Sequence, residues 1–259
     1  METNDYLERL ELRATVPTIR RVPAGRITDW LGAGWRDLKA NPIPSLAYGL
    51  LFGLGGDLIL LASIGHPHLF SVAVSGFFLV APLLATGLYE LSRQHANGTH
   101  PIFIESLRAF RHNGESIALF GVALALIVIL WERVSAIVFA LLNHGTAGDI
   151  AHFMSQTIVS GQNLSFVLAW LALGGMLALL TFALSVVSVP LMLDRQLDVV
   201  TAMLTSLHAF AANTGMLLLW AATIVALTLL GFATLLFGLV IIMPILGHAS
   251  WHAYRDLVE

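Results

Sequence analysis

The chain has 259 residues, of which 57% are apolar and only 11% are charged, and its mean hydropathy is +0.82. Soluble domains carry roughly 25% charged residues, so the composition excludes a water-soluble globular protein. The sequence contains no cysteine, which excludes disulfides, thiolate nucleophiles and cysteine-ligated zinc or iron–sulfur sites. We therefore expect an all-α, polytopic bundle of membrane helices.

The uncharged runs are long enough to be counted as membrane spans, because a hydrocarbon core of about 30 Å needs about 20 apolar residues per helix. They predict about six transmembrane helices, near residues 44–64, 69–91, 116–131, 164–193, 216–230 and 235–251. After the third span, Glu132 and Arg133 precede an amphipathic continuation to Leu142.

The basic residues predict the orientation, since Lys and Arg concentrate in cytoplasmic loops. With these spans, all but one of the 13 basic residues fall on one side of the membrane, and the exception is Arg133. Both termini are thus expected in the cytoplasm of a bacterial inner membrane, and residues 143–163 are expected outside.

Three segments before the odd-numbered spans resemble one another: Trp35–Asn41, Leu107–Asn113 and Leu207–Asn213. Each predicts a short amphipathic helix that lies in the membrane interface. Each also ends in Asn, which tolerates the left-handed conformation that can end a helix. We therefore predict a repeated unit that begins with an interfacial helix.

The even-numbered spans carry a related mark, because each contains a proline: Pro82, Pro190 and Pro244. The predicted unit is an interfacial helix, a span and a returning span with proline, in three parallel copies. The repeats are assigned to residues 27–92, 104–197 and 200–259, within one membrane domain of residues 26–259. Residues 1–25 form a polar cytoplasmic tail.

Asp57 is the one carboxylate well inside an apolar span, and such residues are candidates for function because burying a charge in a membrane is costly. Helical spacing places it on one face with Gly49, Gly53 and Gly56. Since small residues allow close helix packing, Asp57 is predicted to face the bundle interior. The alternative is a structural pair or a position near the outer surface.

Glu132 and Arg133 are the other intramembrane candidates. Neighbouring side chains diverge on a helix, so the two are not expected to pair with each other. One could meet Asp57 or another helix. In the alternative, the third span ends at Trp131 and Glu132 starts a separate interfacial helix.

His248, His252 and Asp256 follow one another at i+4 steps near the C-terminus. This places two imidazoles and a carboxylate on one helical face, which is typical of a metal or proton site. Trp251 and Tyr254 favour an aromatic belt at the membrane surface instead.

Residues 190–195, 206–213 and 243–255 resemble DUF2189, a family of bacterial integral membrane proteins. The resemblance extends from about Val22 onward and is strongest in the last 70 residues. Some members of that family carry the label of cytochrome c oxidase subunit I, which implies a place beside a respiratory complex.

The histidines argue against a catalytic oxidase subunit, because a haem–copper core needs about six histidines within its spans. Only His248 lies clearly inside a predicted span, with His252 at its end. The other eight histidines fall in loops or interfacial helices.

We therefore expect a non-enzymatic accessory or scaffold protein without a cofactor. Its partners would be the lipid bilayer, other membrane proteins or a second copy of the chain, and not nucleic acid. One alternative is a small-solute transporter or channel that uses Asp57. Another is an accessory or assembly factor of a respiratory oxidase.

Overall fold

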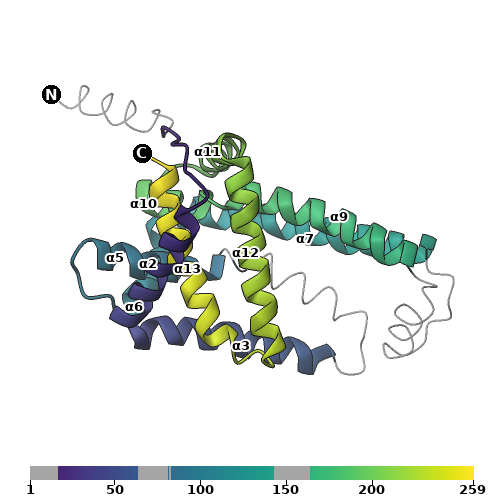
Figure 1. Ribbon diagram of the computed structural model, residues 1–259, viewed down its shortest axis with the longest axis horizontal. Coiled ribbons are helices and arrows are strands. Elements are labelled where there is room, and N and C mark those ends of the chain that lie inside the picture. The colour runs from purple at the N-terminus through teal and green to yellow at the C-terminus, as the bar shows by residue number, and fades with distance from the viewer. Residues whose placement is uncertain (1–16, 64–80, 82, 143–163) are drawn as a thin grey trace.

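The computed structural model describes residues 17–63, 81, 83–142 and 164–259 (Figure 1). Its elements in this part of the chain are helices: α2 (Arg26–Ala40), α3 (Pro42–Ser63), α5 (Thr86–Ala96), α6 (Phe103–His112), α7 (Gly114–Leu142), α9 (Leu164–Ser185), α10 (Ser188–Arg195), α11 (Val199–Ala212), α12 (Thr214–Ala233) and α13 (Leu239–Leu257). The prediction of an all-α protein is confirmed.

The three predicted short helices exist, and each ends at the predicted asparagine. Asn41, Asn113 and Asn213 follow α2, α6 and α11, and the next helix begins one residue later. Their φ angles are −135°, −139° and −130°, so the predicted left-handed conformation is wrong. The reason is that each asparagine carbonyl already accepts the first hydrogen bond of the following helix, so the residue is the N-cap of that helix, with a non-helical backbone of negative φ.

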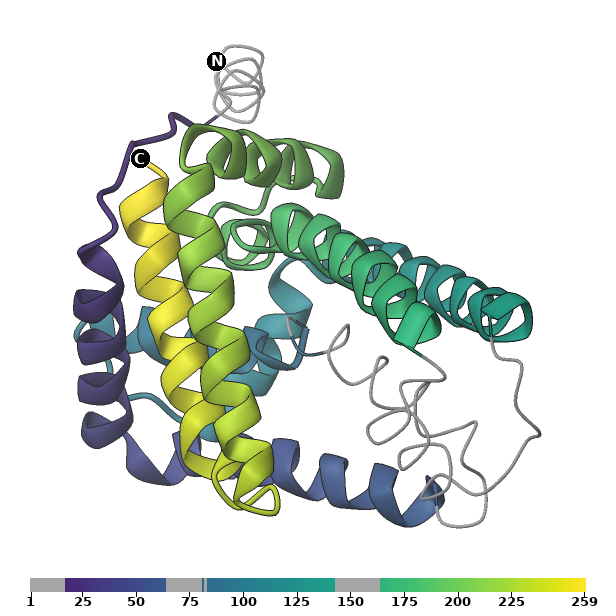
Figure 2. The same cartoon turned by 45° about the vertical axis from the view of Figure 1, so that its right-hand side comes forward.

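Helix α13 packs against α2 and α3 through glycines on both neighbours (Figure 2). A Cβ at Gly34 of α2 would lie 2.5 Å from the carbonyl oxygen of Ile245, and one at Gly49 of α3 would overlap that of Val240. Small residues allow such backbone contact between helices. The predicted glycine face of α3 is thus its contact with α13.

Helices α7 and α9 run side by side and extend away from α2 and α13 (Figures 1 and 2). The rings of Trp131 and Trp170 lie 5.1 Å apart between them. The indole of Trp170 donates a hydrogen bond of 2.7 Å to Ser135, and Gly174 makes room for the Trp131 ring. Tryptophan packing therefore joins the two helices.

Three helical stretches among the described residues are long and apolar enough to cross a membrane: Gly114–Leu142, Leu164–Arg195 and Thr214–Ala233. They correspond to the third, fourth and fifth predicted spans. The first and last predicted spans are helical, as α3 and α13. The second lies largely outside the described residues, as does Pro82, so six spans in three repeats stay a prediction.

Helix α7 continues through Glu132 to Leu142 without a break. The alternative in which a separate interfacial helix begins at Glu132 is therefore wrong. The physical reason is that residues 132–142 contain neither glycine nor proline, so nothing interrupts the helical hydrogen bonds.

The N-terminal segment before α2 lies against the C-terminus. The Arg20 amide donates to the Leu257 carbonyl at 2.9 Å, and the Glu259 amide donates to Thr18 at 3.0 Å. The side chain of Asn213 holds the same segment, because it accepts from the Val22 amide at 2.8 Å and donates to the Arg20 carbonyl at 2.9 Å. Asn213 thus connects the turn before α12 to the segment that pairs with the C-terminus.

The Asn213→Ala variant is expected to be cut by trypsin after Arg20 and Arg21 about tenfold faster, because two hydrogen bonds that hold this segment are lost. Limited proteolysis followed by mass spectrometry measures the rate. Asn113→Ala is the matched control, since Asn113 bonds instead to the carbonyls of Met192 and Leu197. Equal acceleration in both variants would contradict the assigned role of Asn213.

Candidate functional site

Four helices each contribute a buried polar side chain to one cluster, which we call the Asp37–His248 cluster. Its members are Asp37 of α2, Ser45 of α3, Ser92 of α5 and His248 of α13, with His252 at its edge. The first four are between 0% and 4% exposed. The cluster therefore lies in the interior, where these helices meet.

Local helix geometry explains why a carboxylate and an imidazole are found there. The buried face of α2 includes Ile27, Trp30, Gly34 and Asp37, which recur every three or four residues as on one side of a helix. That side packs against α13. In α13, His248 belongs to the buried face as well, so packing of the two helices brings the polar groups together.

The hydrogen bonds within the cluster fix the direction of each donor. A carboxylate only accepts, so Ser92 donates to Asp37 Oδ2 at 2.7 Å. The Ser92 oxygen then accepts from His248 Nδ1 at 2.7 Å. This leaves His248 Nε2 as the acceptor for the Ser45 hydroxyl at 2.9 Å. A neutral His248 thus links α3 to α2 through two serines.

Asp37 carries the negative charge of the cluster. Burial works against the ionised form, but hydrogen bonds from His252 and Ser92 and the electrostatic attraction of His252 outweigh it, so the pKa of Asp37 lies below its usual 3.8. His252 Nε2 is 2.9 Å from Oδ2, and His95 Nε2 is 3.9 Å from Oδ1. Asp37 is thus an ionised carboxylate between two imidazoles.

The predicted set of His248, His252 and Asp256 is not brought together as one site. Asp256 Oδ2 accepts from Arg26 at 2.7 Å and from the Trp30 indole at 2.7 Å, whereas both ring nitrogens of His248 bond to serines. Within the described part of the chain no group of three potential ligands could hold a metal ion. Two i+4 steps separate the first and third residues by about 12 Å along the helix, too far for one ion.

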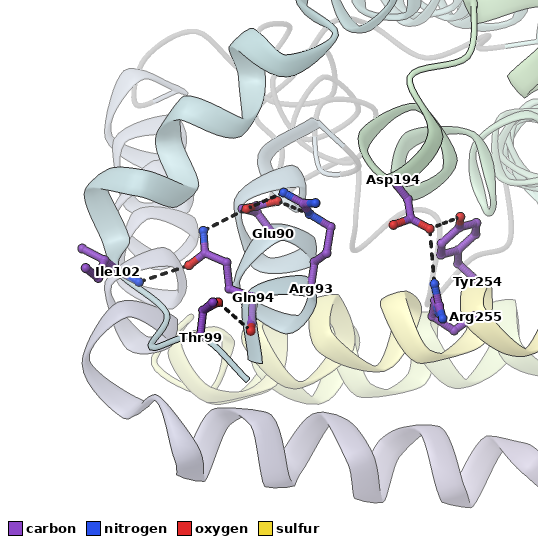
Figure 3. Close-up of polar contacts among 8 residues, drawn as sticks. All are labelled: Glu90, Arg93, Gln94, Thr99, Ile102, Asp194, Tyr254 and Arg255. Carbon is purple, nitrogen blue, oxygen red and sulfur yellow. Dashed lines mark hydrogen bonds and ion pairs between the residues drawn. The ribbon is translucent and has the colours of Figure 1, made fainter. Parts of the chain in front are cut away.

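Two further groups of polar contacts involve α5 and α13, which also contribute to the cluster (Figure 3). Glu90, which is 2% exposed, accepts two hydrogen bonds from Arg93 and one from Gln94. Asp194 of α10 accepts from the Tyr254 hydroxyl at 2.7 Å, so it ties α10 to α13. These contacts satisfy buried charge internally.

Sequence reasoning missed Asp37, Ser45, Ser92 and Glu90. For Asp37 a signal existed, because it follows Trp30 and Gly34 at helical spacing and so belongs to the apolar side of its helix. The serines gave no such signal, since isolated serines in apolar helices commonly bond to their own backbone.

Comparison with known proteins bears on the central part of the chain. Residues 69–194 match the family model described as a predicted integral membrane protein, DUF2189. The resemblance to DUF2189 is thereby confirmed, and the chain is an integral membrane protein. Neither a curated protein nor a solved structure matches the chain.

The DUF2189 match includes α5, α6, α7, α9 and α10. It therefore contains Ser92 and Glu90, whereas Asp37 and His248 lie outside it. It ends at Asp194 and does not extend over the last part of the chain, where the sequence resemblance was expected to be strongest.

The predicted intramembrane residues lie apart from the cluster. Asp57 is exposed on α3, so the prediction that it faces the bundle interior is wrong. The glycines at 49 and 53 meet Val240 of α13, and Gly56 meets Leu236 just before that helix. Within the DUF2189 match, Glu132 and Arg133 pair with each other at 3.1 Å, contrary to expectation, because long side chains can bend toward one another despite diverging Cβ atoms.

Proposed function

We propose that the chain is a non-enzymatic scaffold or accessory protein that binds other membrane proteins, or a second copy of itself, through its exposed apolar helices. The observation that carries this proposal is that polar and apolar side chains are separated between the interior and the surface. The buried polar side chains of the Asp37–His248 cluster bond to one another, and large apolar side chains remain exposed on long helices.

The interior supports a structural role for the polar residues. Ser45, His248, Ser92 and Asp37 place a hydroxyl, an imidazole and a carboxylate in series, as hydrolytic enzymes do. However, Ser45 is 0% exposed, and a nucleophile must be reachable by its substrate. In this arrangement the cluster holds α2, α3, α5 and α13 together.

The surface supports a role in the plane of the membrane. Large apolar side chains are exposed along α7, α9 and α12, among them Leu126 at 62%, Met176 at 65% and Val225 at 55%. Lipid covers such surfaces, and close packing with another helix can replace that lipid. A scaffold uses this kind of surface.

The scaffold proposal is favoured over a transporter because of Asp57. A transport pathway would place this carboxylate inside the bundle, but Asp57 is exposed on α3. We further propose an inner-membrane location with both termini in the cytoplasm. The basic residues support this orientation, and so does the pairing of Thr18 with Glu259, because it requires both ends on one side.

Site-specific photo-crosslinking in native membranes tests the scaffold proposal. A benzophenone amino acid at Leu126, Met176 or Val225 is expected to crosslink the chain to a defined membrane protein or to a second copy. Leu124 is the matched control, because it lies on α7 but is only 2% exposed. A mild-detergent purification should recover the same partner in stoichiometric amount. Recovery of the chain alone, with adducts only to lipid, would contradict the proposal.

A further inference from the structure

A cavity of about 440 Å³ lies between α2 and the last turns of α13. Its charged lining consists of Arg26, Arg36, Arg255, Asp29 and Asp256. The buried serines and His248 do not line it, and the rest of its wall consists of Thr28, Trp30, Gly32, Ala33 and His252. An excess of positive charge therefore surrounds an open volume.

Ion pairs within the cavity lining determine which of its arginines remain available to bind an anion. Arg26 lies 2.7 Å from Asp256 and 2.9 Å from Asp29, so its guanidinium pairs with both carboxylates. Arg255 makes only a 3.4 Å contact with Asp194, and its side chain is 59% exposed. No carboxylate among the described residues lies within ion-pair distance of Arg36. Two guanidinium groups can therefore bind an anion.

Gly32 makes the position of Arg36 possible. A Cβ at Gly32 would lie 3.6 Å from a terminal nitrogen of Arg36, so the guanidinium lies back over the preceding turn of α2. A larger side chain at position 32 would fill this part of the cavity. The glycine thus leaves room for a group bound between Arg36 and Arg255.

The surroundings of the cavity indicate that the anion belongs to a lipid. Trp35, next to Arg36, is 41% exposed, and the Lys39 ammonium lies 4.9 Å from its ring centroid. Immediately after α2, Ile43 is 83% exposed at the start of the apolar helix α3. Tryptophan and lysine beside an apolar surface are typical of the headgroup region of a bilayer.

We propose that this cavity binds the phosphate of an anionic phospholipid headgroup, with Arg36 and Arg255 as the charged donors. Guanidinium groups bind phosphate oxygens through paired hydrogen bonds, and basic pockets beside membrane helices bind anionic headgroups. This assignment goes beyond the scaffold function and does not depend on any protein partner.

Native mass spectrometry of the full chain in a neutral detergent tests the site, with equimolar phosphatidylglycerol and phosphatidylcholine as probes. The wild type is expected to retain phosphatidylglycerol preferentially. Arg36→Gln and Arg255→Gln should each weaken its binding about fivefold, the effect of one basic residue at a membrane surface. Lys39→Gln removes the same charge from α2 outside the cavity lining and should leave the binding unchanged.

The Asp29→Asn variant provides a test in which lipid binding is expected to increase. Removing this exposed carboxylate frees part of Arg26 and should strengthen phosphatidylglycerol binding. Equal weakening by Lys39→Gln and Arg36→Gln would overturn the site in favour of diffuse surface charge. Displacement of the lipid by equimolar inorganic phosphate would overturn the lipid assignment. The partner crosslinks are unaffected by either outcome, so this inference and the scaffold proposal fail separately.

Discussion

Replacing Gly49 with alanine is expected to lower the free energy of unfolding by about 3 kcal/mol, the upper end of typical overpacking effects. The new methyl group would overlap the carbonyl of Val240 and press on Pro244. Backbone atoms cannot rotate away as a side chain can, so α3 and α13 must separate. Denaturation by sodium dodecyl sulfate, followed by circular dichroism, measures the change.

Gly175→Ala is the matched control for Gly49. Gly175 also lies inside a helix, but a Cβ there would meet nothing within 4 Å. Alanine at this position should therefore stabilise the protein by up to about 1 kcal/mol, because alanine loses less backbone entropy in a helix. Similar destabilisation by both substitutions would show that the α3–α13 contact is not what makes Gly49 sensitive.

Asp37→Leu is expected to cost about 3 kcal/mol, in the range measured when one partner of a buried charged contact is removed. Ser92 and His252 would then lose the acceptor that each uses at 2.7 Å and 2.9 Å. Asp37→Asn keeps an acceptor oxygen and should cost less. Asp29→Asn, on the exposed side of the same helix, should change the stability by less than about 0.5 kcal/mol.

The same carboxylate predicts how stability depends on pH. Because the folded protein holds the pKa of Asp37 below 3.8, the stabilisation is fully present above that pH. It is lost as the pH falls further and the folded carboxyl becomes protonated. The stability difference between wild type and Asp37→Asn should therefore shrink below pH 3.8. A difference that stays constant down to the lowest pH would contradict an ionised Asp37.

Features that depend on residues close together in the sequence were predictable from it. The ends of α2, α6 and α11 follow from similar short segments that close with Asn41, Asn113 and Asn213. The packing role of Gly49 and Gly53 follows from their spacing on α3. In each case the pattern and its consequence lie within one helix or one turn.

The Asp37–His248 cluster could not be predicted in the same way, because its residues come from four helices. His248 is 203 residues from Ser45 and 156 residues from Ser92, and only tertiary packing brings them together. The interpretation of His248, His252 and Asp256 failed for a related reason. It considered one helix face and not the neighbouring helix, where Arg26 and Trp30 bind Asp256 more directly.

The length of α7 has a consequence for the part of the protein beyond the bilayer. Its 29 residues extend about 43 Å, whereas the hydrocarbon layer is about 30 Å thick. If Gly114 marks one boundary of the bilayer, Arg133 lies about 28 Å farther along the axis, near the opposite boundary where charge is tolerated. The last turns of α7 then extend beyond the bilayer, packed against the beginning of α9. A partner on that side of the membrane could therefore reach this protein without entering the lipid.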